Sequence, residues 1–440
     1  MKRSETRSVV ATLTGLLASN GAILACGVGT GVLVARWLSP ADRGTLATLA
    51  LWPQILGAIG LLSLNESMVL RLSARGVRLG AAIAGAVWAA SLLAVLTCVG
   101  GWLVLPHLLG ERTEVLPLAR WFLILFVPAN FLALLFLTLD TAKRDFHIYN
   151  RLRLLGPSVY LAALLVLLSL GRLNLSTAAI ASLSGSILVT LLCLYRHRTA
   201  LLHRTNVSEL VALVQTSAGI HGTALLSLVS AQMDRIAVAV LLGPVALGFY
   251  SVAITISGSL LGVIATTSQS FLFPEIALST EPGTRRFWLQ KGLGGSTLAV
   301  VLTTAVLCCS CPLLLVPVFG PEYRPSVIPA FFAILAYAPF CLRQIAVRCL
   351  RATGRAWPGN WSEITSILCF VAFVVPAARY LGLSGVCLAL GLSNSLGLVV
   401  CASELKRSHQ LEPRAWMLPN GADLRRLHAW AVGRWQTLAA

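Results

Sequence analysis

The sequence predicts an all-α polytopic membrane protein with about 12 transmembrane helices in two pseudo-symmetric six-helix bundles around a central cavity. Composition is the first reason: 57% of the 440 residues are hydrophobic, 11% are charged, and the mean hydropathy is +0.82. A soluble domain carries about 25% charged residues. The other reasons are recurring apolar runs and an internal repeat, and each element follows from one of them.

Apolar runs between charged residues are long enough to cross a bilayer, which takes about 20 residues in a helix. β-barrel strands are excluded because they alternate polar with apolar residues, whereas stretches such as VVLTTAVLCC are apolar on every side. The predicted helices span residues 9–34, 46–70, 79–105, 121–139, 154–170, 177–194, 211–241, 248–273, 292–318, 327–350, 361–379 and 383–401.

The distribution of Lys and Arg predicts the orientation, because cytoplasmic loops are enriched in both. With the N-terminus inside, 26 of the 34 basic residues fall on the cytoplasmic side. The prediction is therefore twelve spans with both termini cytoplasmic. The external side keeps Arg36, Arg43, Arg112, Arg120, Arg172, Arg235, Arg324 and Arg379.

The net charge of +18 follows from this topology and needs no nucleic acid as a partner, since the charge faces an anionic lipid leaflet. The first apolar run is too long for a signal peptide and stays as the first helix. Residues 406–440 form a cytoplasmic tail, in which Leu424, Leu427, Ala431 and Trp435 share one helical face. That face predicts either a helix lying on the inner leaflet or a disordered tail.

An internal repeat divides the chain. ARWLSPADRG, residues 35–44, aligns without gaps on AVLLGPVALG, residues 239–248, in a pattern L-[SG]-P-x-x-x-G at an offset of 204. A second pair, residues 126–146 and 337–357, aligns at an offset of 211. Six helices in each half give both halves the same orientation in the membrane. The predicted bundles are residues 1–205 and 206–405.

The repeated element reads as a tight external turn with no chemical role. Pro40 and Pro244 would fix the backbone, while Gly44 and Gly248 would tolerate the reversal into the next helix.

The residues MDRIAVAVLLGPVALGFYSVAITISGSL, the later FPEIA, ARWLSPADRG and LRATGRAWPGNW together resemble polysaccharide-biosynthesis flippases of the multidrug/oligosaccharidyl-lipid/polysaccharide exporter superfamily. The resemblance covers nearly the whole chain. It implies two six-helix bundles in a V that move an oligosaccharide, carried on a polyprenyl diphosphate, across the bacterial inner membrane. Lipid II flippases usually have two further helices, so the resemblance favours the O-antigen, capsule or exopolysaccharide branch.

An anionic diphosphate needs cations along its path, and Arg meets phosphate oxygens with two parallel hydrogen bonds. Arg235, with Asp234 beside it, is the deepest candidate, about 12 Å from the end of its predicted helix. Either Arg235 contacts the diphosphate, or Asp234 and Arg235 clamp neighbouring helices. Arg343 and Arg348 are candidates for an inner phosphate contact or are solvated helix ends.

Glu66 is the candidate for coupling transport to a proton gradient, because a carboxylate inside a span can titrate during the cycle. The alternative pairs it with Arg71 or places it at a cytoplasmic helix end. Asn65, beside it, and Gln269, its counterpart in the repeat, are candidates for the substrate path. His221 is predicted to be a polar core residue.

No cofactor and no metal is predicted, because the chain has no GxxxxGK[ST] loop and no HExxH. The eleven cysteines read as small apolar residues. Expected partners are the lipid-linked oligosaccharide, membrane lipids, and a polysaccharide polymerase or glycosyltransferases. A cation-coupled drug or metabolite antiporter of the same superfamily is the nearest alternative. A membrane-embedded glycosyltransferase or polymerase is a third alternative. The favoured prediction, a flippase, means that the protein is not an enzyme.

Overall fold

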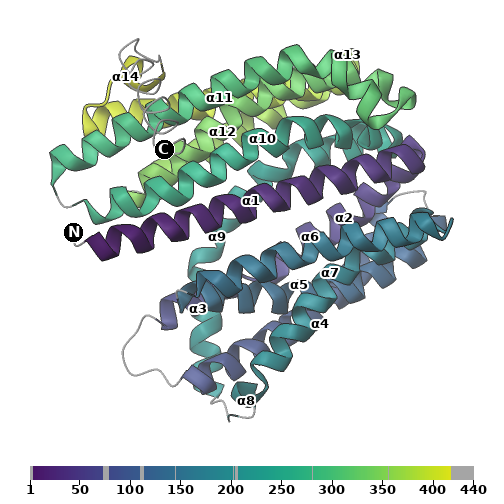
Figure 1. Ribbon diagram of the computed structural model, residues 1–440, viewed down its shortest axis with the longest axis horizontal. Coiled ribbons are helices and arrows are strands. Elements are labelled where there is room, and N and C mark those ends of the chain that lie inside the picture. The colour runs from purple at the N-terminus through teal and green to yellow at the C-terminus, as the bar shows by residue number, and fades with distance from the viewer. Residues whose placement is uncertain are drawn as a thin grey trace, which may run out of the picture. The chain divides into compact units, whose positions relative to one another are not determined.

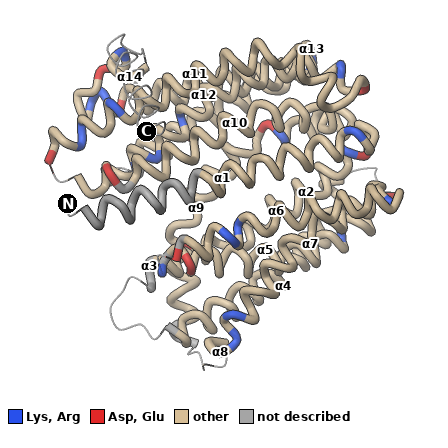
Figure 2. Tube along the Cα trace, viewed as in Figure 1, with Lys and Arg blue, Asp and Glu red and all other residues tan. Residues whose placement is uncertain are grey.

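The computed structural model describes residues 3–72, 79–109, 113–143, 145–201, 203, 207–279, 281–354 and 356–417. Among these residues every regular element is a helix and no strand occurs, so the chain is an all-α polytopic membrane protein, as predicted. The described part holds nine segments long and apolar enough to cross a membrane. Figure 2 shows long stretches of α4, α11 and α13 without charged residues.

The chain divides into two compact units, which are described separately. The first comprises residues 1–255 and 315–327, and the second comprises residues 256–314 and 328–440. In Figure 1 the colour follows the order of the elements along the chain, from purple at the N-terminus to yellow at the C-terminus. The helices of the first unit are α1 (Arg3–Trp37), α2 (Pro40–Gly60), α3 (Leu64–Leu72), α4 (Leu79–Leu109), η1 (Thr113–Val115), α5 (Leu116–Ala142), α6 (Phe146–Ser169), α7 (Leu175–Arg196), α8 (Arg198–Leu201), α9 (Val207–Ala237) and η2 (Val238–Leu242).

Two long helices, α10 (Gly243–Leu278) and α11 (Pro282–Phe319), contribute residues to both units. The short helix η3 (Pro321–Ser326) belongs to the first unit. The second unit also contains α12 (Val327–Ala352), α13 (Ala356–His409) and α14 (Arg414–Met417).

Helix α4 shows how the first unit is packed. Between residues 84 and 94 its buried face consists of small residues, including Ala86, Ala89, Ala90 and Ala94. Its exposed face carries large apolar residues at helical spacing: Trp88, Leu92, Val95, Leu96, Val99 and Leu103. Small residues let helix backbones approach closely, while large apolar side chains suit a lipid environment. This distribution is the reverse of a soluble helix.

The predicted helix 46–70 is interrupted in the structure. Helix α2 ends at Gly60, and α3 begins at Leu64 after Leu62 and Ser63, whose φ angles are 51° and 58°. Both residues are in the left-handed region that non-glycine residues rarely adopt. The apolar run itself does not reveal such a break, because it continues through Leu61, Leu62 and Leu64 before Asn65 and Glu66.

The predicted helices 361–379 and 383–401 correspond to one run, α13, with a kink at Gly382. The φ angle of 56° at Gly382 interrupts the helical geometry, so the two predicted segments are distinct in direction.

The repeated motif begins with a break between helices, at Leu38–Ser39 in the first copy and at Gly243, whose φ angle is 81°, in the second. Its remaining residues are helical, so the prediction that Gly44 and Gly248 serve a backbone reversal is wrong. Ser39 caps α2, accepting a hydrogen bond from the Asp42 amide at 3.1 Å, and Pro40 occupies the first turn. Gly44 and Gly248 lie inside α2 and α10. What requires glycine is a close contact: a Cβ on Gly44 would collide with the carbonyl oxygen of Pro244, and one on Gly248 with that of Pro40.

Candidate functional site

Asp234 and Arg235 lie near the end of α9 and point to different partners. The Asp234 side chain is buried, and Tyr250 of α10 donates a hydrogen bond from its hydroxyl to Asp234 Oδ2 at 2.7 Å. Arg235 is half-buried and donates from Nη1 to Gln232 Oε1 at 3.3 Å within α9. Asp234 therefore joins α9 to α10, while Arg235 as a whole keeps part of its surface accessible.

Asn65 and Glu66 lie on α3 beside the break. Helix α3 and the break contact α9 through two polar pairs: Ser63 Oγ with His221 Nδ1 at 3.2 Å, and Ser67 Oγ with Ser217 Oγ at 2.6 Å. Glu66 is exposed, and its charge acts on His221. His221 is buried, as predicted for a polar core residue.

The Arg235 and Glu66 regions are separate sites on α9. His221, the contact point for α3, precedes Asp234 by 13 residues along the helix. At 1.5 Å per residue this places the two regions about 20 Å apart. Arg71, the alternative partner of Glu66, has a side chain outside the described part.

Three candidates lie in the second unit. Gln269 is half-buried on α10, and Arg348 is exposed on α12. Arg343 on α12 is buried, and its Nε donates to Asn394 Oδ1 of α13 at 2.8 Å. The carboxylate of Glu363, also buried, acts electrostatically on Arg343 and forms an ion pair with Arg351 at 3.4 Å. In this conformation Arg343 connects α12 to α13.

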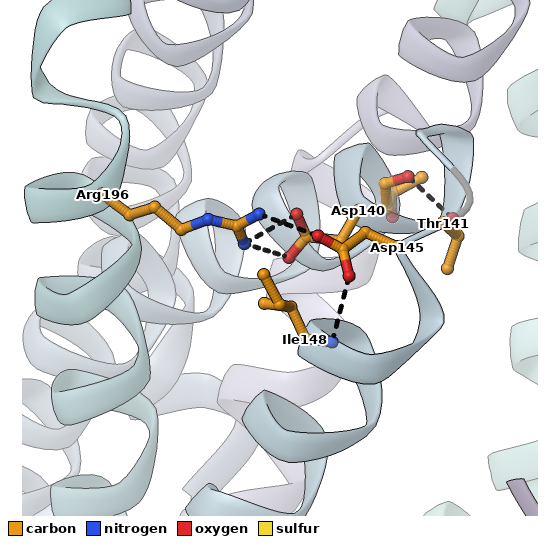
Figure 3. Close-up of polar contacts among 6 residues, drawn as sticks. Asp140, Thr141, Asp145, Ile148 and Arg196 are labelled. Atoms are coloured by element: carbon orange, nitrogen blue, oxygen red, sulfur yellow. Dashed lines mark hydrogen bonds and ion pairs between the residues drawn. The ribbon is translucent and has the colours of Figure 1, made fainter. Parts of the chain in front are cut away.

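Sequence reasoning missed the best-defined ion pair. Arg196 at the end of α7 contacts Asp140 of α5 at 2.9 Å and Asp145 at 3.4 Å, and the Asp140 side chain is fully buried. Figure 3 shows the Arg196 side chain reaching both carboxylates, while Asp145 also accepts from the Ile148 amide. The second repeat gave a signal, since an offset of 211 places Asp140 on Arg351 of the other buried pair.

Arg43 was also missed as a site residue, because its place near a helix end suggested an exposed loop. Its side chain is only 5% exposed. Nε donates to Ser251 Oγ at 2.7 Å and Nη1 to the Gly31 carbonyl at 3.1 Å, while the guanidinium lies over the rings of Phe319 and Tyr323. In the part of the chain that the structure describes, no carboxylate forms an ion pair with Arg43.

The fold is that of transporters of the MOP superfamily. A structure titled lipid II flippase MurJ in an inward closed conformation superposes with a TM-score of 0.74 at 13% identity, covering 90% of this chain and 87% of the other. An inward-facing multidrug resistance MATE family transporter gives 0.68 at 13% identity, covering 88% and 94%. A MOP superfamily transporter from Pyrococcus furiosus gives 0.58 at 13% identity, covering 91% and 95%.

The sequence itself shows the family. Residues 33–328, which are 296 of the 440, match the model of a family described as polysaccharide biosynthesis protein. The chain belongs to this family, and the resemblance seen in its motifs is confirmed. Among curated proteins, none matches this sequence.

Proposed function

We propose that this protein is a flippase that moves a polyprenyl-diphosphate-linked oligosaccharide across the bacterial inner membrane for surface polysaccharide biosynthesis. The observation that carries the proposal is the family match over residues 33–328 in a chain with the fold of MOP superfamily transporters. Two six-helix bundles, residues 1–205 and 206–405, alternate between inward-open and outward-open states around the substrate. The protein moves a preformed molecule and is not an enzyme.

The test is deletion of the gene in its host and analysis of the lipid-linked intermediate. A flippase mutant completes the oligosaccharide on its carrier, and the intermediate accumulates on the cytoplasmic leaflet while surface polysaccharide disappears. Loss of the intermediate itself would point to a glycosyltransferase instead. Normal polysaccharide with increased sensitivity to toxic cations would point to the antiporter, whose solved relatives include MATE transporters.

Arg235 is the proposed contact for the diphosphate, because the residue is only partly buried, whereas Arg343 is buried against α13. Arg235→Ala should abolish export with normal protein levels, and Arg235→Lys should restore it only partly because a point charge lacks the two-pronged guanidinium. Asp234→Asn serves as the comparison: the bond from Tyr250 supports a helix-joining role, so loss of protein from the membrane is expected there. Normal export by Arg235→Ala would remove Arg235 from the substrate path.

Glu66 is the proposed coupling residue, and its exposure on α3 supports access to protons. Glu66→Gln should flatten the pH dependence of transport in vesicles while the protein stays folded. An unchanged pH profile would exclude it.

A further inference from the structure

The two copies of the repeated motif pack directly against each other. The carbonyl oxygen of Pro244 occupies the position that a Cβ on Gly44 would need, and the carbonyl oxygen of Pro40 does the same to Gly248. The contact is reciprocal, because the same two positions of the motif meet in both directions. The two copies are related by an offset of 204, and a reciprocal contact is what a pseudo-two-fold pair gives. All four residues belong to the first compact unit.

Arg43, next to Gly44, contacts α10 beside this contact and also connects it to α1 and η3. Its guanidinium donates to Ser251 of α10 and to the Gly31 carbonyl of α1, and it lies 5.5 Å from the centre of the Tyr323 ring in η3. Nη2 lies 3.5 Å from Thr255 Oγ1. Nearby, Arg36 donates from Nε to the Val318 carbonyl at 2.8 Å, which joins the end of α1 to the end of α11.

These contacts are of a kind that can separate and form again. Gly44 and Gly248 meet backbone atoms and present no side chain of their own, so nothing at these two positions has to change rotamer when the surfaces part. Arg43 is held by neutral acceptors and aromatic rings rather than by a carboxylate, so separation leaves no unpaired acid behind. A buried guanidinium without a counter-ion is costly, and water entering an open state would solvate it. The difference in free energy between the closed and open arrangements is therefore smaller than it would be if opening had to break a buried ion pair.

We infer that Pro40–Gly44 and Pro244–Gly248 form the gate at one end of the transport path, and that Arg43 holds this gate shut. The inference rests on the proposed transport function. The distribution of Lys and Arg predicts that this end is external. During transport the two motifs separate, and the bonds from Arg43 to α1 and α10 are broken.

The experiment measures the thiol reactivity of a cysteine placed at Ser251, beside Arg43, in a protein whose eleven native cysteines have been replaced. The protein is purified and held in lipid nanodiscs, so that a polar maleimide reaches both faces. In the protein that carries Ser251→Cys and the replaced native cysteines but no other change, labelling should be slow. Gly44→Ala, Gly248→Ala and Arg43→Gln should each speed labelling by about tenfold, the factor that a shift of roughly 1.4 kcal/mol in the open–closed equilibrium gives.

Gly262→Ala is the matched control, because Gly262 also lies on α10 and an added Cβ there would meet nothing within 4 Å. It should leave the labelling rate unchanged. Unchanged rates in all three gate variants would overturn the inference. Failure of all three variants to accumulate would overturn it as well, since the contact would then be a permanent joint of the fold.

The readout needs no substrate, so it separates this inference from the proposed function. Faster labelling in a protein that exports no polysaccharide would keep the gate and refute the flippase. Constant labelling in a protein that does export polysaccharide would refute the gate alone.

Discussion

At the scale of single residues, His197 illustrates how burial decides a protonation state at the membrane edge. It follows the last residue of α7, its side chain is 7% exposed, and its ring stacks on Phe136 with centroids 5.1 Å apart. Burial, together with the positive charges of Lys143 and Arg196, lowers the pKa of His197 from the ordinary value to about 4. The ring is therefore neutral in the folded protein at physiological pH.

A pH dependence of stability follows. In the unfolded chain His197 becomes protonated as the pH falls through about 6.5, whereas in the folded protein it becomes protonated only as the pH falls through about 4. Stability is therefore lost as pH falls from 6.5 towards 4, by about 2 kcal/mol at pH 5. We expect the thermal midpoint of the purified protein to fall between pH 7 and pH 5, and His197→Phe, which keeps the stacked ring, to remove most of that fall. Exposed His147 provides the control: His147→Phe should leave the pH effect intact.

At the scale of elements, the Asp140–Arg196 pair ties α5 to α7. Asp140 is fully buried, and its charge is compensated chiefly by the ion pair with Arg196 and less by Lys143 at the end of its own helix, so Arg196 is the main reason its burial is tolerable. Asp145, at the cap of α6, extends the same cluster to a third helix. The pair thus fixes three helix ends at the predicted cytoplasmic side.

Removing one partner should cost more than removing both. Arg196→Gln leaves the Asp140 charge buried alone, and we expect a loss of about 3 kcal/mol in unfolding free energy. Adding Asp140→Asn to Arg196→Gln should recover part of that loss, because the uncompensated charge is gone. Urea unfolding of the unchanged protein, of Arg196→Gln and Asp140→Asn singly, and of the double variant measures both steps. Asp145→Asn, which removes a half-exposed partner, should cost under about 1 kcal/mol. Additive effects at Asp140 and Arg196 would show that they do not act as a pair.

The elements also show what sequence patterns can and cannot reveal. Helix positions follow from apolar runs, since a bilayer demands about 20 apolar residues wherever the chain crosses. The break at Leu62–Ser63 left no such trace, because the apolar run continues past it and its contact with His221 joins residues 158 apart. The sequence revealed the glycines of the repeat, but the role predicted for Gly44 was wrong, because only the structure shows which backbone lies against it. Ion pairs such as Asp140–Arg196 join residues 56 apart, and spacing alone does not pair them.

At the scale of the whole molecule, the nine apolar segments of the described part are consistent with a larger number of crossings. The segment Leu210–Leu278 has 69 residues, which as a single helix would be about 100 Å long, more than three times the bilayer core. Trp357–His409, with 53 residues, bends at Gly382. Each of these segments contains two of the predicted helices, and α2 with α3 corresponds to another that is not among the nine.

Twelve crossings with the N-terminus inside make a prediction about sidedness. Ser39 follows the first predicted span and Glu322 follows the ninth, and both are exposed in the structure. An even number of spans lies between them, so single cysteines at both positions should react with an impermeant thiol reagent added to intact cells lacking the native cysteines. Arg407 follows the twelfth span and is exposed, so a cysteine there should react only after the membrane is opened. Arg75 should behave like Arg407, although it lies outside the described residues. Labelling of Ser39 without Glu322 would mean that the number of spans between them is odd, and labelling of Arg407 alone would invert the whole topology.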